Sequence, residues 1–107
     1  MPDLDALRDR YLDLTREALP ARAAAEGWPL RFDHCFMRVV LDDVFGGVWY
    51  DHVEGRPAYR HLDADALRAA IAVAESILDE GEPRLRALDA QSLRFRGKRP
   101  KPAPRRA

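Results

Sequence analysis

Three side chains that could bind an anion together recur at every fourth residue near the middle of the chain: His34, Arg38 and Asp42. Residues four apart on a helix lie along one face, where each can reach the next. An arginine binds carboxylate or phosphate groups, a neighbouring aspartate can orient its guanidinium, and a histidine can exchange a proton near neutral pH. The spacing therefore predicts either a site for an anionic ligand or a polar seam that packs against another element.

Two further groups of polar side chains are expected to close such a site. One group precedes a predicted helix and the other follows the last predicted helix; they are Tyr59, Arg60 and His61, and Arg94, Arg96 and Lys98. A guanidinium in a largely apolar helix is costly unless it is paired. Because Asp42 is the nearest carboxylate on the same helix face, we predict that it pairs with Arg38.

Catalytic and metal chemistry find little support in this stretch. His34 and Cys35 are adjacent, so on a helix their side chains point about 100° apart and cannot form a nucleophile and base pair. The histidines and the cysteine lack the close spacing of a zinc site. Gly46 and Gly47 lack the following lysine and serine or threonine of a phosphate-binding loop. We therefore predict no metal site.

Helices are predicted for the elements that position these side chains. Apolar residues recur at three- and four-residue spacing, and the scarcity of threonine and isoleucine disfavours strands. Pro20 is expected to kink or break the first helix, Gly46 to end the second and Asp63 to cap the third. The predicted fold class is all-α, a small single-domain bundle of four to five helices. The predicted helices span residues 4–26, 34–45, 64–80 and 84–95.

The apolar positions of these helices predict the hydrophobic core. They recur at helical spacing on one face of each helix. Trp28, which precedes the second helix, is expected to anchor the connection there. The predicted core residues are Leu7, Tyr11, Leu14, Phe36, Val40, Leu41, Val44, Leu67, Ile71, Ala74, Leu78 and Leu88.

Length and composition place the chain among single-domain globular proteins. Its 107 residues are 47% hydrophobic and 34% charged, which allows a modest core. No apolar run approaches the roughly 20 residues that cross a bilayer, so no membrane span is expected. The first residues lack the basic and apolar segments of a secretory signal. The single cysteine forms no internal disulfide, and a cytoplasmic location is expected.

The zero net charge conceals an uneven distribution. From Arg94 onward there are seven basic residues and no acidic ones, whereas residues 1–93 carry 11 basic and 18 acidic residues. We expect residues 1–98 to form the helical domain and the proline-rich residues 99–107 to form a disordered basic tail. Such a tail either folds back on the acidic body or binds a polyanion, such as nucleic acid or an acidic protein surface.

Several segments resemble those of one group of proteins. Asp33–Asp42, Gly46, Trp49, Pro57–Leu62 and Ser92–Lys98 are similar to segments of short bacterial proteins that are often labelled GNAT-family N-acetyltransferases. The resemblance covers most of residues 28–98. It implies an acyl-transfer activity with acetyl-coenzyme A as the cofactor.

Two classes of function remain open from the sequence. The first is a non-catalytic binding module without a cofactor, in which the central helix carries a site for an anionic small molecule and the basic tail contacts a polyanion. The second, implied only by the resemblance, is a small enzyme that uses an acyl-coenzyme A donor.

Overall fold

The structure is a computed structural model, and it describes residues 3–98. Within these residues all regular elements are helical and no strand is present, which confirms the all-α prediction. The predicted tail, residues 99–107, lies outside the described part of the chain. The elements are α1 (Leu4–Leu12), the π-helical turn η1 (Asp13–Ala18), α2 (Leu19–Glu26), α3 (Asp33–Phe45), the 3₁₀ turns η2 (Trp49–Asp51) and η3 (Ala58–His61), α4 (Ala64–Glu80) and α5 (Glu82–Phe95).

The backbone of the first predicted helix is helical without a gap from Leu4 to Glu26, but the turn before Pro20 is a wider, π-helical one. Helices α1 and α2 are joined through η1, where the Leu19 backbone N–H donates to the Leu14 carbonyl five residues earlier. Proline has no backbone N–H to donate and its ring crowds the preceding turn, so the wider spacing accommodates it without ending the helix. Helix α2 then ends at Gly27, which has a left-handed φ of 68°. A π-helical turn therefore replaces the predicted kink or break.

The helix ends are set by local residues, and the predicted end at Gly46 and cap at Asp63 are both present. Asp63 caps α4 as predicted and accepts a hydrogen bond of 2.8 Å from the Ala66 backbone N–H. Gly46 ends α3 with a φ of 64°. Asp33 is the first helical residue of α3 and not its cap; its carboxylate accepts only from the His34 backbone N–H, at 2.8 Å.

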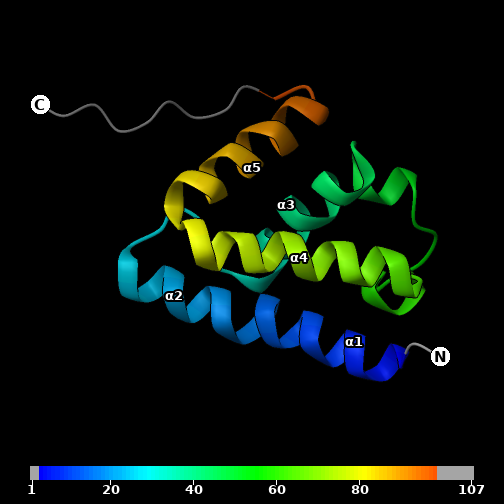
Figure 1. The fold of residues 1–107 in the computed structure, drawn as a ribbon. Helices are drawn as coiled ribbons and strands as arrows, with labels where there is room; N and C mark the ends of the chain where they lie inside the picture. The colour runs from blue at the N-terminus through cyan, green and yellow to red at the C-terminus, as the bar shows by residue number, and fades with distance from the viewer. Residues whose placement is uncertain (1–2, 99–107) are drawn as a thin grey trace, which may run out of the picture.

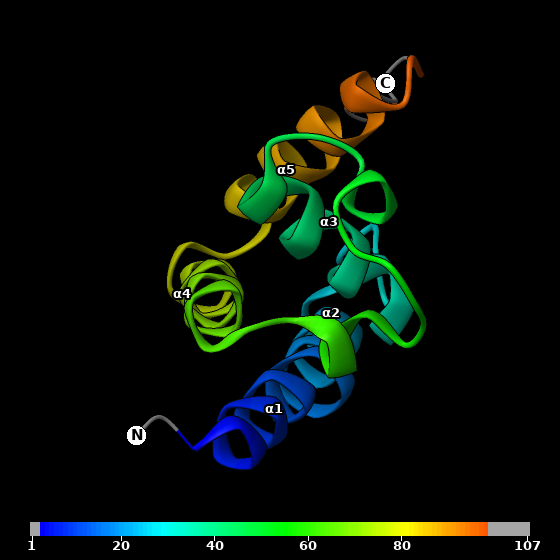
Figure 2. The same ribbon diagram turned by 90° about the vertical axis from the view of Figure 1, so that its right-hand side faces the viewer.

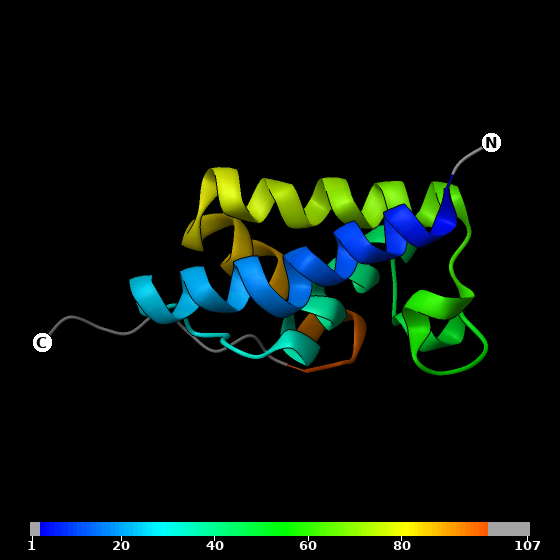
Figure 3. The same cartoon turned by 90° about the horizontal axis from the view of Figure 1, so that it is seen from below.

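Helix α3 lies at the centre of the fold. It packs against α5, α4 and η1, while α4 runs alongside α1 (Figure 1). Figure 2 shows α3 between α5 and the rod that α1, η1 and α2 form, with α4 to one side. The turns η2 and η3 lie at the same end of the molecule as the N-terminal end of α4 (Figure 3). Of the described helices, none has the length and apolar character needed to span a membrane.

The core agrees with the predicted one at most positions. Leu7, Val44 and Leu78 are only half-buried, whereas the other predicted core residues and Trp28 are buried. The pattern in the sequence missed further buried side chains on the helices, because each helix is covered on more than one face, and it missed two in the connection between α3 and α4. On the helices these are Leu19, Ala23, Val39, Ala70, Ile77 and Leu85, and in the connection they are Val53 and Leu62.

Candidate functional site

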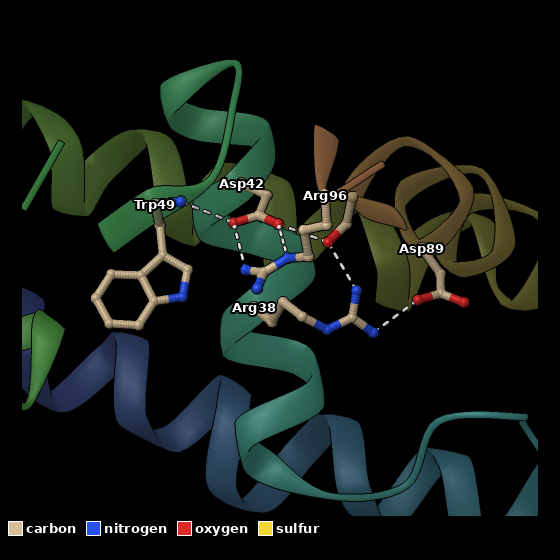
Figure 4. A network of polar contacts seen from close by, with 6 residues as sticks. Arg38, Asp42, Trp49, Asp89 and Arg96 are labelled. Carbon is tan, nitrogen blue, oxygen red and sulfur yellow. Dashed lines mark hydrogen bonds and ion pairs between the residues drawn. The ribbon is translucent and has the colours of Figure 1, made fainter. Parts of the chain in front are cut away.

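The most densely bonded polar group of the described residues is the carboxylate of Asp42. It is completely buried and accepts four hydrogen bonds (Figure 4). The Ser92 hydroxyl donates at 2.6 Å, the Trp49 backbone N–H at 3.0 Å, and Arg96 through Nε at 3.1 Å and Nη2 at 3.2 Å. These bonds offset the loss of hydration that a buried carboxylate suffers. Asp42 therefore joins α3 to the start of η2 and to the end of α5.

Arg38 does not form the predicted contact with Asp42. Its Nη1 donates to the Ser92 hydroxyl at 2.7 Å, and its Nη2 donates to Asp89 at 2.7 Å. A serine hydroxyl can accept and donate at once, so Ser92 bridges the two residues. The physical reason is that α5 packs against this face of α3 and brings its own carboxylate within reach. Figure 4 shows the Arg38 guanidinium directed toward Asp89.

His34 is not part of this network. Its side chain is 78% exposed, and Nδ1 lies 3.7 Å from the Asp33 carboxylate. The imidazole stacks on the ring of Phe32, with the centroids 5.8 Å apart. The predicted stripe of three side chains is therefore divided: Arg38 and Asp42 face α5, and His34 lies at the exposed start of α3.

The two groups expected to close the site are also divided. Arg96 reaches Asp42, whereas Arg94 and Lys98 are exposed. The carbonyl of Arg60 accepts from Arg8 at 3.2 Å. The ring of His61 packs so closely on Gly55 that a Cβ there would lie 2.5 Å from Nε2. Of the six residues, only Arg96 joins the Asp42 network.

A cavity beside α3 brings three of the predicted site residues together. Its volume is about 440 Å³, within the range of about 300–1,000 Å³ that small-molecule sites occupy. His34, Arg38 and Tyr59 are among its lining residues, and Asp42 is not. The remaining lining residues are Tyr11, Arg16, Met37, Leu41, Trp49, Arg56, Pro57 and Ala58.

Two arginines of the cavity, Arg16 and Arg56, were not predicted as site residues. The guanidinium of Arg16 lies over the Tyr59 ring, 5.6 Å from its centroid, and that of Arg56 lies over the Trp49 ring at 5.4 Å. Within residues 3–98 neither arginine forms an ion pair with a carboxylate. Aromatic stacking holds each cation in place without neutralising its charge. The position of Arg56 beside an aromatic-rich stretch is the one signal in the sequence that could have indicated it.

Two phenols in the cavity wall have opposite environments. Tyr11 is 1% exposed, and its hydroxyl has no hydrogen-bond partner in the described part of the chain. Burial raises the pKa of Tyr11 far above its ordinary value, and the charge of Arg16 acts in the opposite direction. Arg60, and after it Arg16, lower the pKa of Tyr59. The Tyr11 hydroxyl is therefore a neutral donor close to a positive charge.

Residues 3–98 contain no cluster of three or more His, Cys, Asp or Glu side chains that could hold a metal ion.

The chain matches no protein-family model, and no curated protein or solved structure shows significant similarity to it. The acetyltransferase resemblance therefore stays an expectation from the sequence.

The two interpretations of Arg38 can be separated by substitution. Because both ends of its guanidinium contact α5, Arg38→Met is expected to lower the free energy of unfolding by about 1.5–3 kcal/mol. Arg38→Lys is expected to cost less, since an ammonium can still pair with Asp89. Urea unfolding measures both. Unchanged stability in both variants would contradict the polar seam.

Proposed function

We propose that this protein is a non-catalytic binding module that holds an anionic small molecule in the cavity beside α3. The observation that supports this most directly is the charge of the cavity wall. Arg16, Arg38 and Arg56 line it, and no Asp or Glu is among the described lining residues. The body of the chain has an excess of acidic residues, so this concentration of positive charge is local. A recess lined by one sign of charge attracts ligands of the opposite sign.

The arginines do not contribute equally to this proposal. Arg38 has partners for its guanidinium in Asp89 and Ser92, so its charge is largely neutralised within the fold. Arg16 and Arg56 keep their charge. They are the residues that we assign to the ligand, while Arg38 links the cavity wall to α5.

Binding without catalysis fits the remaining side chains of the cavity. The lining contains no Ser, Cys, Asp or Glu within the described residues, so a nucleophile paired with a general base is not assembled there. Met37, Leu41 and Trp49 supply apolar contact area. Apolar walls with a few charged groups are typical of ligand sites.

The second interpretation, an acyl-coenzyme A enzyme, remains an alternative proposal. An acyl donor is also an anion with an apolar portion, so it is compatible with the same cavity. The proposed polyanion contact belongs to the basic tail, which lies outside residues 3–98. Both alternatives can be tested together with the binding proposal.

The test is a thermal-shift screen of the full chain with four probes: 2-naphthoate, ATP, acetyl-coenzyme A and a short DNA duplex. A ligand at 100 times its dissociation constant stabilises the folded state by about 2.7 kcal/mol. We expect a small organic anion to raise the melting temperature, and the double variant Arg16→Met/Arg56→Met to lose that rise.

The other outcomes of the screen would overturn the proposal. A response to acetyl-coenzyme A alone supports the enzyme alternative. A response to DNA alone places binding on the tail. A rise that persists in the double variant excludes the cavity as the site, as does the absence of any rise with the small anions. Arg68→Met is the matched control, because Arg68 lies on α4 away from the cavity and pairs with Asp65.

A further inference from the structure

The Tyr11 hydroxyl is the most unusual polar group in the cavity wall. Buried hydroxyls nearly always have a hydrogen-bond partner, and one without a partner costs stability. Tyr11 is buried, it lines the cavity, and its hydroxyl is unpaired within the described residues. A phenylalanine would fill the same space without that cost. We therefore expect the hydroxyl to have a function that its contacts within the fold do not explain.

The positive charge of Arg16 indicates that this function is the binding of an anion. Arg16 lines the same cavity as Tyr11, and although burial raises the Tyr11 pKa, the charge of Arg16 acts against that rise. A neutral phenol donates one hydrogen bond, and a guanidinium presents a planar fork of donors that matches a carboxylate. Together they form a short set of donors for one small planar anion. Arg38 adds no donor, because its terminal nitrogens are directed to α5.

The rest of the wall sets the other half of the ligand. Met37 and Leu41 extend along α3 from this set of donors, and the Trp49 side chain forms another part of the wall. Figure 4 shows the Trp49 ring pointing away from the Asp42 carboxylate, so the indole is free of that network. These surfaces are apolar, and they match a ligand whose body carries no charge.

We infer that the ligand is a monocarboxylate with an apolar body, whose carboxylate accepts a hydrogen bond from the Tyr11 hydroxyl and pairs with Arg16. This inference rests on the proposed function and defines its ligand class. The body of the ligand lies over Met37 and Leu41. The unpaired hydroxyl lowers the stability of the fold, and the ligand carboxylate supplies the hydrogen-bond acceptor that it lacks.

The test uses calorimetric titration with 2-naphthoate and with octanoate, each compared with the neutral amide of the same shape. Wild-type protein is expected to bind the carboxylates and to bind the amides at least tenfold more weakly. Tyr11→Phe is expected to weaken carboxylate binding about 10- to 100-fold, which corresponds to the loss of a hydrogen bond to a charged group. Its melting temperature without ligand is expected to equal or exceed that of the wild type.

Two further variants keep the test decisive. Tyr50→Phe is the matched control, because Tyr50 is 50% exposed and does not line the cavity; its binding is expected to be unchanged. Arg16→Gln changes an exposed side chain, so its fold is expected to be retained while carboxylate binding is lost. It therefore reports on the same site if Tyr11→Phe proves unstable.

The outcomes separate this inference from the proposed function. Naphthyl phosphate is titrated as a fifth compound. If it binds and the carboxylates do not, the anion-binding function stands and the monocarboxylate inference is overturned. Equal binding of carboxylate and amide, or full carboxylate binding by Tyr11→Phe, also overturns it. If none of these compounds binds, the proposed function itself fails.

Discussion

Asp42→Ala is expected to lower the free energy of unfolding by about 3–5 kcal/mol, which is the usual cost of removing one partner from a buried ion pair. The substitution leaves the Arg96 guanidinium, 17% exposed, without its carboxylate. The Trp49 backbone N–H and the Ser92 hydroxyl also lose their acceptor. A domain of this size has a total stability of about 5–15 kcal/mol. The variant is therefore expected to be marginally folded.

Chemical unfolding in urea measures this effect, and Asp65→Ala provides the control. Asp65 also pairs with an arginine, Arg68, at 3.1 Å, but its side chain is 95% exposed. An exposed pair contributes at most about 1 kcal/mol. The double variant Asp42→Ala/Arg96→Met should recover part of the loss, because the unpaired guanidinium is removed with its partner. Equal losses in Asp42→Ala and Asp65→Ala would show that the buried network contributes no more than a surface pair.

Phe36→Ala is expected to cost about 3–5 kcal/mol, the range for removing a buried aromatic side chain. Phe36 is completely buried in α3, whereas Phe32, one turn earlier, is 65% exposed. The same substitution at Phe32 removes little buried surface and is expected to change stability by less than about 0.5 kcal/mol. Thermal and urea unfolding of the two variants give the comparison. A loss at Phe32 as large as that at Phe36 would contradict the described packing of α3.

The helices could be predicted because their signals are local. Apolar residues three and four positions apart, the Asp63 cap and the Gly46 stop each act within a few residues. The π-helical turn of η1 could not be predicted, because it depends on how the whole rod accommodates Pro20 while it packs on α3 and α4. Predictions from spacing therefore located the helices more reliably than the geometry inside them.

The site was harder to predict, because its contacts cross the fold. The spacing of Arg38 and Asp42 correctly placed both on one face of α3, but it could not show that α5 would supply Asp89 and Ser92. The pairing of a guanidinium follows from the nearest carboxylate in space, and the sequence gives distance only along one helix. Tyr11 was predicted as a core residue, and its buried position is confirmed. That its hydroxyl would lack a partner depends on every side chain around it.

The Asp42 network also determines which of several possible dockings of α5 is adopted. Apolar contacts between two helices are non-directional, so α5 could slide along α3 by one turn, about 5.4 Å, and still cover apolar surface. The bonds of Asp42 to Ser92 and Arg96, at 2.6–3.2 Å, would all be broken by such a slide. The buried Asp42 and the half-buried Arg96 would then be left as charges without partners. The polar residues therefore fix the register of α5 on α3, because they make one alignment of the two helices much more favourable than alignments shifted by one turn.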